Sequence, residues 1–370
     1  MKIATTRAVI ATAAILLTAG TLTACSNGAG SGSGSTSTTG ASTAKIGLLL
    51  PDSVTARYAN ADRPYFTAKI KALCPNCTVL YANADADAAK QQQQAESMLT
   101  QGAKVLVISA QDGKAAATIV SEAKAKNVPV ISYDRLIDSP DSAAYISFDN
   151  EKVGELQGTA LVEKLKSDGV APGDGGILMV NGSPTDNNAT LFKAGAHKMI
   201  DPSGYKVLAE FSTPDWDPAQ AQNWVAGQIS QFGAKIKAVY AANDGTGGGA
   251  IAALQAAGVK PVPPVTGQDA QLTGIQNILA GTQYMTVYKA IKPEAEQAAQ
   301  MAIDLVNGKK LATTVTVNTA SGAAIPSVLL TPVAVTVKNI ESTVVKDGFL
   351  TAAQICTAAY AAACTANGIQ

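Results

Sequence analysis

Residues 128–150 read VPVISYDRLIDSPDSAAYISFDN, and this stretch decides how the rest of the chain is interpreted. The apolar run 128–132 predicts a buried strand that ends in the charged pair Asp134 and Arg135, and a second short strand is expected at 144–148. A carboxylate and a guanidinium at the end of an apolar strand cost free energy unless a partner satisfies them. A surface ion pair or a bound polyhydroxyl ligand would both do so.

The segment before this stretch repeats the same rhythm of apolar strands and amphipathic helices. The apolar runs are continuous rather than alternating, which is typical of a parallel sheet that is covered on both faces. The pattern therefore predicts a doubly wound α/β domain. Its expected strands are 46–50, 78–82, 105–109 and 128–132, and its expected helices lie near 60–73, 86–101 and 113–126.

The rhythm starts again after Asn150 and predicts a second α/β domain. A strand at 285–288, a helix at 293–307 and a strand segment at 328–337 then close the fold, and an alanine-rich tail follows. The expected helices of this second domain are 151–167, 187–200, 217–232, 247–257 and 271–280, and its expected strands are 176–180, 206–211, 236–241 and 265–267.

The N-terminus has the pattern of an export signal. Residues 1–24 carry Lys2 and Arg7 ahead of an apolar run that is too short for a stable membrane span. The ending Leu-Thr-Ala-Cys resembles a bacterial lipobox, which predicts that cleavage leaves Cys25 as a lipidated N-terminus; an ordinary signal peptide with a chance cysteine is the alternative. Residues 25–44 would then form a flexible tether rich in Ser, Gly and Thr.

Four further cysteines, Cys74, Cys77, Cys356 and Cys364, form an even set in an exported chain, which favours disulfides. Three pairings are possible, and we favour the local one, Cys74 with Cys77 and Cys356 with Cys364. A thioredoxin-like redox motif and a zinc site are alternatives. The redox reading is disfavoured because Cys74 is expected at the end of a helix, and the zinc reading because Cys356 and Cys364 are poorly spaced.

Composition excludes several classes of protein. With 370 residues, 47% of them apolar, and a net charge of zero, the chain can bury more than one core and lacks the basic surface of a nucleic-acid binder. Its one histidine, His197, assembles neither a catalytic triad nor a metal site, so we expect no enzymatic activity, no metal and no cofactor. The segment 245–250 matches a dinucleotide fingerprint, but it follows a late strand of an exported chain, where no such cofactor is supplied.

Polar side chains follow the predicted strands of both domains. Ligands of open parallel sheets bind beyond the carboxyl ends of the strands, so we expect these side chains to meet at one site. Asp, Asn and basic groups form paired hydrogen bonds with vicinal hydroxyls, and Tyr58 and Trp216 lie in loops from which a ring could stack on a sugar. The strand-end residues are Asp134, Arg135, Asp186, Asn187, Asn188, Asn243, Asp244, Gln268, Asp269 and Lys289.

Several long motifs resemble the periplasmic monosaccharide-binding proteins of ABC importers, in particular the D-xylose-binding group. The resemblance implies the type I fold, in which two doubly wound domains are joined by a three-segment hinge. It places one lobe at 45–150 plus 289–315 and the other at 151–288 plus 316–370. The motifs are YDR (133–135), YISFDNEKVGELQ (145–157), GSPTDNNA (182–189), AANDGTGGGAI (241–251), GQDA (267–270), GTQYMTVYK (281–289) and LLTP (329–332).

The resemblance also implies a set of sugar contacts, carried over motif by motif. To the strand-end residues it adds Arg57 on the first loop and assigns Trp216 the role of a stacking platform. With Tyr58, the expected ligand-binding residues are Arg57, Tyr58, Asp134, Arg135, Asp186, Asn188, Trp216, Asn243, Asp269 and Lys289.

The leading hypothesis is a lipid-anchored receptor on the extracytoplasmic face of the cell membrane. It would be a monomer that binds xylose, or glucose, arabinose or another aldose, closes by hinge motion, and docks on ABC permease subunits. The alternative is a sugar sensor that presents its closed form to a membrane receptor. A DNA-binding repressor of the same fold is excluded, because a tether stands where a helix-turn-helix would precede Lys45.

Overall fold

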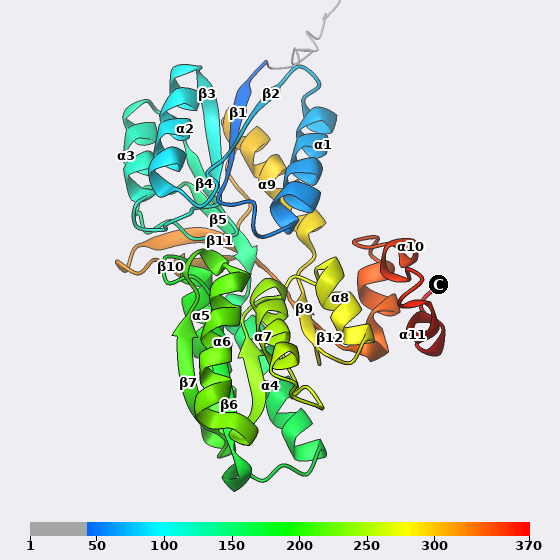
Figure 1. Ribbon diagram of the computed structural model, residues 1–370. Helices are drawn as coiled ribbons and strands as arrows, with labels where there is room; N and C mark the ends of the chain where they lie inside the picture. The colour runs from blue at the N-terminus through cyan, green and yellow to red at the C-terminus, as the bar shows by residue number, and fades with distance from the viewer. Residues whose placement is uncertain (1–42) are drawn as a thin grey trace, which may run out of the picture. The chain divides into compact units, whose positions relative to one another are not determined.

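The structure is a computed structural model that describes residues 43–370, and two lobes with separate sheets make up this part of the chain (Figure 1). The predicted signal peptide, Cys25 and nearly all of the tether lie outside the described residues. Seven strands form the sheet of the first lobe. From edge to edge they are β10 (Val315–Asn318), β11 (Ala324–Leu330), β5 (Ala144–Phe148), β4 (Val130–Tyr133), β3 (Ala103–Ile108), β1 (Lys45–Leu50) and β2 (Thr78–Asn83).

Helices cover both faces of this sheet, as the continuous apolar runs predicted. Every residue of β1 after Lys45 is buried, because its side chains point alternately into two separate apolar cores. One core holds Phe66 and Ile70 of the first helix, and the other holds Met98 and Ile119. The covering helices are α1 (Arg63–Leu73) and α9 (Ile291–Val306) on one face, and α2 (Ala88–Thr100) and α3 (Ala117–Ala125) on the other.

The second lobe repeats this architecture around a parallel sheet in the order β7-β6-β8. Two of its helices pack very closely, since a Cβ atom on Gly154 would lie 1.9 Å from the carbonyl oxygen of Phe192. The strands are β6 (Gly176–Asn181), β7 (Lys206–Ser212) and β8 (Ile236–Ala241), with α4 (Asn150–Ser167) and α5 (Asn187–Ile200) on one face, and α6 (Pro218–Phe232) and α7 (Asp244–Ala256) on the other.

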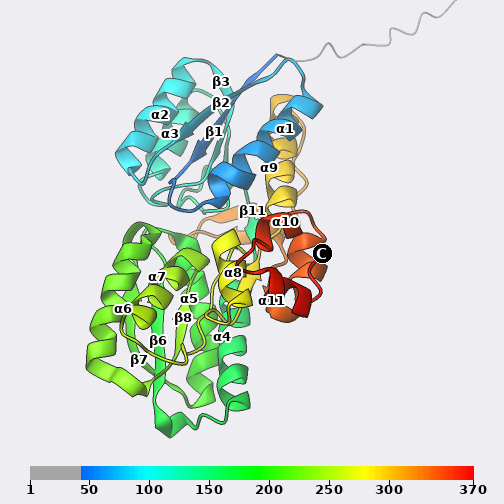
Figure 2. The same cartoon turned by 45° about the vertical axis from the view of Figure 1, so that its right-hand side comes forward.

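The chain ends in a small antiparallel ladder and a helical tail that pack beside the second lobe (Figure 2). None of the helices within residues 43–370 combines the length and apolarity that crossing a membrane requires. These last elements are α8 (Leu272–Leu279), β9 (Thr286–Tyr288), β12 (Val333–Val335), α10 (Ala352–Ile355) and α11 (Ala361–Ala366).

The chain crosses between the lobes three times, and the predicted fold class is confirmed. The crossings lie at 148–150, between the end of β5 and the start of α4, at 288–291, between β9 and α9, and at 330–333, between β11 and β12. The fold is therefore α/β, with two doubly wound lobes that share a three-segment hinge. The stretch 128–150 ends at the first crossing.

One predicted lobe boundary is wrong. Residues 316–330 were expected in the second lobe, but β10 and β11 extend the first sheet, because Ser327 pairs with Tyr145 and Leu330 pairs with Phe148 in a parallel ladder. The expected strand 328–337 is consequently split by the third crossing. The expected strand 265–267 reduces to a single bridge between Val239 and Val265.

The four cysteines lie in the two local pairs that we favoured, each pair at disulfide distance. The sulfur atoms of Cys74 and Cys77 lie 1.99 Å apart, and those of Cys356 and Cys364 lie 2.05 Å apart. Cys74 is the C-cap of α1, so no helix N-terminus faces its sulfur. Residues 43–370 contain no cluster of three or more His, Cys, Asp or Glu side chains that could hold a metal ion.

Candidate binding site

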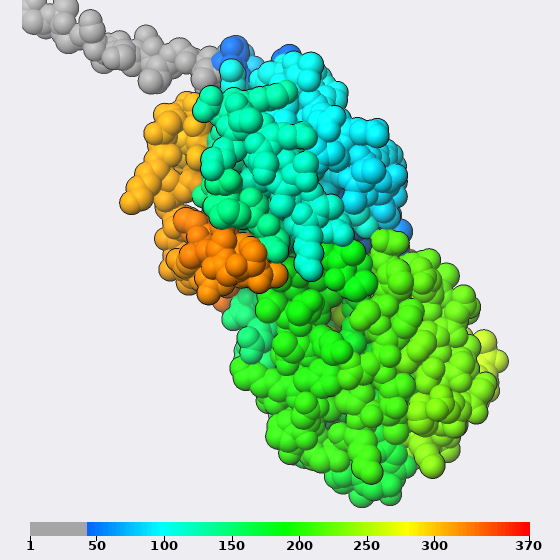
Figure 3. All heavy atoms as spheres, turned by 90° about the vertical axis from the view of Figure 1, so that its left-hand side faces the viewer, coloured from blue at the N-terminus to red at the C-terminus, as the bar shows by residue number. Residues whose placement is uncertain are grey.

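A cavity lies between the lobes and collects all of the expected ligand-binding residues. Each of these side chains is buried, so the lobes are closed around the cavity. In the space-filling view, the first lobe (cyan and teal) touches the second lobe (green) along one side (Figure 3). Gln111 of the first lobe donates a hydrogen bond to Asp215 of the second lobe over 3.1 Å. The lining residues are Thr55, Arg57, Tyr58, Asp134, Arg135, Asp186, Asn188, Phe192, Trp216, Asn243, Gln268, Asp269 and Lys289.

Arg57, on the loop after β1, is the best-connected cation of the first lobe. Its guanidinium forms a fork with Asp62, with Nε to Oδ2 at 3.0 Å and Nη2 to Oδ1 at 2.7 Å. The remaining donors reach Asp134 Oδ2 at 2.8 Å and Glu294 Oε2 at 2.8 Å. Four donor contacts with three carboxylates hold this side chain rigidly, since a planar fork has little freedom once both nitrogens are bonded.

Asp134 forms hydrogen bonds with residues of the first lobe, the hinge and the second lobe. Its carboxylate accepts from Arg57 and from Lys289 Nζ at 3.5 Å, while Asn188 Nδ2 of the second lobe donates to its carbonyl at 3.0 Å. Burial alone would raise the pKa of Asp134, but Arg57, Lys289 and Arg135 outweigh it and hold the pKa well below its ordinary value. Asp134 is therefore a charged acceptor at neutral pH.

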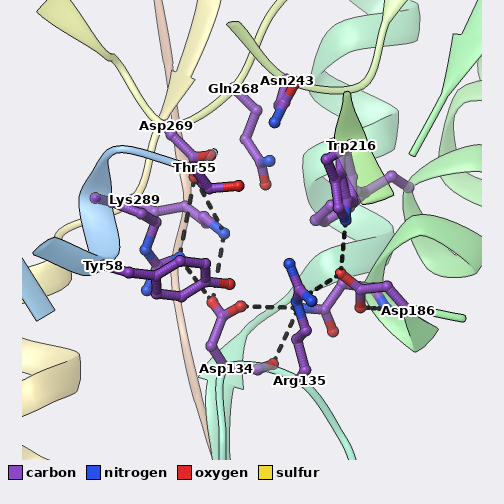
Figure 4. A pocket seen from close by; sticks show the side chains of 13 residues that line it. Thr55, Tyr58, Asp134, Arg135, Asp186, Trp216, Asn243, Gln268, Asp269 and Lys289 are labelled. Atoms are coloured by element: carbon purple, nitrogen blue, oxygen red, sulfur yellow. Dashed lines mark hydrogen bonds and ion pairs between the residues drawn. The ribbon is translucent and has the colours of Figure 1, made fainter. Parts of the chain in front are cut away.

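Arg135 joins the lobes by a second ionic bridge. Its Nη2 lies 3.2 Å from Asp52 of the first lobe, and its Nε lies 2.9 Å from Asp186 of the second. The Asp186 carboxylate also accepts a hydrogen bond from the indole Nε1 of Trp216, at 3.2 Å. Arg135 thus fixes the carboxylate that in turn orients the Trp216 ring, and Figure 4 shows Tyr58 and Trp216 on opposite sides of the cavity.

Several of the second-lobe residues that line the cavity lie at or near the N-termini of helices. Asp186 caps α5 by accepting from the backbone N–H of Asn188 at 2.9 Å, and Asn243 caps α7 by accepting from Thr246 at 2.8 Å. Trp216 lies two residues before α6, in the short turn η4 (Pro214–Trp216). Caps place short polar side chains where the helix dipole is positive, so this wall favours oxygen-rich ligands.

Three cavity residues have a left-handed backbone. The φ angles are 58° at Asp134, 58° at Trp216 and 87° at Asp269. Residues other than glycine rarely adopt this region, and such conformations gather at ligand sites, where the surrounding structure holds them in place. In each case the strained backbone turns a side chain from a strand end or turn into the cavity.

Two acceptor atoms on the cavity wall lack a hydrogen bond of good geometry. Oε1 of Gln268 has none, and Oδ1 of Asp269 has none although Lys289 Nζ lies 3.3 Å away. A buried acceptor without a donor costs free energy. A hydroxyl-bearing ligand between the lobes would supply donors to both atoms.

Comparison with known proteins places the chain in a family. The model of the periplasmic binding protein domain matches residues 46–310. The chain belongs to this family. Its members are substrate-binding proteins of transport systems rather than enzymes, so no catalytic step is assigned to the cavity.

The relatives are similar over nearly their whole length. The D-xylose-binding periplasmic protein of Escherichia coli is 42% identical over 313 residues, which cover 84% of this chain and 92% of the relative. The multiple sugar-binding periplasmic receptor ChvE of Rhizobium radiobacter is 34% identical, with 84% and 92% covered. An ABC transporter solute-binding protein of Clostridium phytofermentans, solved with bound β-D-glucose, is 30% identical with a TM-score of 0.78, over 84% of this chain and 99% of that one.

The structure adds three lining residues that the expected set lacked: Thr55, Phe192 and Gln268. Gln268 had been recognised as a strand-end residue, and Phe192 follows Asn188 by one helical turn, a spacing that could have revealed it. Glu294 accepts a hydrogen bond from Arg57 but could not be predicted as its partner. It lies in the first turn of α9, far from Arg57 along the chain, and does not follow a strand. His197 lies away from the cavity and pairs with Asp201 and Glu210.

Proposed function

We propose that the protein captures a monosaccharide, D-xylose in the first instance, in the cavity between its lobes and delivers it to an ABC importer. Support comes from the 42% identity to the D-xylose-binding protein of Escherichia coli. Solved structures related to this chain hold D-glucose, so glucose is the first competitor to test. Arabinose and other aldoses follow.

The chemistry of the cavity wall carries this proposal. Carboxylates, amides, two guanidinium groups and one ammonium group line the cavity, and its apolar surface consists of aromatic faces. Such donors and acceptors bind the hydroxyls of a pyranose in pairs. Trp216, Phe192 and Tyr58 would cover its C–H faces.

Closure is the proposed binding step. Since every lining side chain is at most a few percent exposed, a ligand enters only after the lobes have opened. The contacts that join the lobes, Arg135 with Asp186 and Asn188 with Asp134, are then remade as the hinge closes. The closed form would dock on the permease.

Calorimetry with xylose, glucose, arabinose and ribose tests the assignment. The Asn243→Ala variant should lose about 1.5 to 3 kcal/mol of binding free energy, roughly ten- to a hundred-fold in affinity. Because Asn243 also caps α7, a matched control is needed. Asp87→Ala removes the cap of α2, where Asp87 accepts from Lys90 at 3.0 Å outside the cavity, and should leave affinity unchanged. Equal affinities in wild type and Asn243→Ala would contradict the proposed site.

A lipid anchor at Cys25 completes the proposal. The Leu-Thr-Ala-Cys sequence is the support for it. Mass spectrometry of the mature N-terminal peptide should find a diacylated Cys25, and Cys25→Ser should release the protein from the membrane fraction. An unmodified mature N-terminus elsewhere in residues 1–44 would contradict the anchor. Size-exclusion chromatography should show a monomer.

A sensory role is the second candidate, favoured by the relative that is called a multiple sugar-binding receptor. It predicts that the sugar-loaded form co-purifies with a membrane receptor. The transport role predicts co-purification with permease subunits instead.

A further inference from the structure

The C-terminal tail, residues 337–370, contacts the hinge of the two lobes. It forms a compact unit beside α8 and the third crossing, drawn in orange to red in Figures 1 and 2. None of its residues lines the sugar cavity. Its role therefore has to be inferred from what it touches.

The tail is rooted in the second lobe. Ile340, Val344 and Ile355 are fully buried in one apolar cluster with Ile275 of α8 and Val335 of β12. Gln276 Nε2 of α8 also donates to the carbonyl of Ile355 at 3.4 Å. The disulfide between Cys356 and Cys364 ties α10 to α11, so the unit moves with the second lobe.

Phe349 extends from this unit to the hinge. It packs against a small cluster formed by Ala61, Phe148 and Ile291, to which Leu330 also contributes. Phe148, Ile291 and Leu330 come from the three different crossings between the lobes, and Ala61 belongs to the first lobe. The Phe349 ring also lies 5.4 Å from the ring of Tyr288, at the second crossing.

We propose that residues 337–370 act as a hinge brace that favours the closed form. The brace is fixed to one lobe, while Phe349 packs against a cluster whose residues come from the other lobe and from the first two crossings. A rotation of the lobes about the hinge changes these contacts, and they are formed in the closed arrangement. Removing the ring should therefore shift the population toward the open form and weaken ligand binding without altering the cavity.

The brace can be tested without any sugar. Spin labels on unnatural side chains at Lys114 and Gln222, exposed positions on the first and second lobes, would report the lobe-to-lobe distance and leave the cysteines untouched. In ligand-free protein, Phe349→Ala should move the distance distribution toward longer separations. Phe349→Leu, which keeps most of the apolar contact, should lie close to wild type. If the alanine variant fails to fold, the double cysteine variant described below carries the test.

Phe211→Ala is the matched control. It removes another half-buried phenyl ring whose aromatic partner, Trp224, also lies 5.4 Å away, but within the second lobe and away from the hinge. It should leave the distance distribution unchanged. The double variant Cys356→Ser with Cys364→Ser loosens the root of the brace and should act in the direction of Phe349→Ala.

The affinity measurement rests on the proposed function, whereas the distance measurement does not. Phe349→Ala should weaken sugar binding roughly 5- to 150-fold, the usual range for coupling between two sites, with Phe211→Ala near wild type. If wild type binds no monosaccharide, the proposed function fails while the distances still report on the brace. Distance distributions that are the same in wild type, Phe349→Ala and the double cysteine variant would overturn the brace.

Discussion

The guanidinium of Arg57 donates to the carboxylate of Asp134 over 2.8 Å, although 77 residues separate them in the chain. Arg57 comes from the loop after β1, and Asp134 comes directly after β4. Both strands are parallel and end at the same edge of the sheet, which brings the loops together. The same arginine is shared with Asp62 and Glu294, so a single cation organises the first-lobe wall of the cavity.

Replacing Arg57 with alanine should destabilise the fold strongly. The change leaves the carboxylates of Asp62, Asp134 and Glu294 buried without their shared partner, which typically costs about 3 to 5 kcal/mol. Urea unfolding followed by circular dichroism would measure the loss. Lys198→Ala breaks an exposed pair of ionic contacts with Glu151 and Glu155 and should change stability far less. Similar losses in both variants would contradict the role of Arg57.

Asp244 should make stability depend on pH. This side chain is buried behind the cavity wall and accepts from Gln283 at 2.7 Å and from the backbone of Gln271 at 2.8 Å. Burial raises its pKa from 3.8 to about 7. Between these values the folded state holds a proton that the unfolded state has released, so stability falls as pH rises from about 4 to 7 and then levels off.

Asp244→Asn should remove this dependence. Relative to the variant, the wild type should lose up to about 4 kcal/mol of unfolding free energy across the window, since each pKa unit corresponds to about 1.4 kcal/mol. Thermal or urea unfolding at several pH values between 4 and 8 gives the difference curve. Asp141→Asn, which removes a carboxylate from an exposed ion pair with Lys124, is the surface control. If the difference in stability between wild type and Asp244→Asn does not change with pH, Asp244 is ionised throughout this range.

Gly182→Ala should displace the Trp216 ring. A Cβ atom at position 182 would lie 2.0 Å from the indole, so the ring has to move out of its place against Asp186. We expect sugar affinity to fall at least about ten-fold and tryptophan fluorescence to shift, because stacking depends on ring placement. Gly248→Ala, in α7 of the same lobe with nothing within 4 Å, is the matched control and should retain affinity. Unchanged affinity in Gly182→Ala would remove Trp216 from the site.

The cysteine pairing is directly measurable. Non-reducing peptide mapping of the purified protein should yield the linked pairs Cys74 with Cys77 and Cys356 with Cys364. A cross-link between residues 74–77 and 356–364 would contradict the local pairing.

The buried parallel strands, and the edge of the sheet at which the site lies, could be predicted because both depend on local sequence patterns. Continuous apolar runs mark strands that are buried on both faces, and the residue after each run is forced to the carboxyl edge of the sheet. That reasoning found Asp134, Asp186 and Asn243. It failed for β11, because membership of a sheet depends on a partner strand far away in the chain, here β5.

Residues that act from helix faces could not be located in the same way. Phe192 reaches the cavity from the second turn of α5, and Glu294 reaches Arg57 from α9, 237 residues further along the chain. A helix shows many faces with the same apolar spacing. Only the packing of α9 against α1 and the first sheet decides which one meets the site.

The stretch 128–150 shows which features follow from the sequence alone and which depend on the tertiary structure. By itself, the sequence determined that a buried strand ends in Asp134 and Arg135, that a second strand follows, and that the chain then enters another α/β unit, because apolar runs and polar strand ends are local properties. Only the tertiary structure decided that Asp134 contacts Arg57 and Lys289 and that Arg135 bridges the lobes through Asp186. It also decided that Phe349 of the tail packs against the cluster that contains Phe148. Those partners come from separate elements, and the packing of the two lobes about the hinge brings them within contact distance.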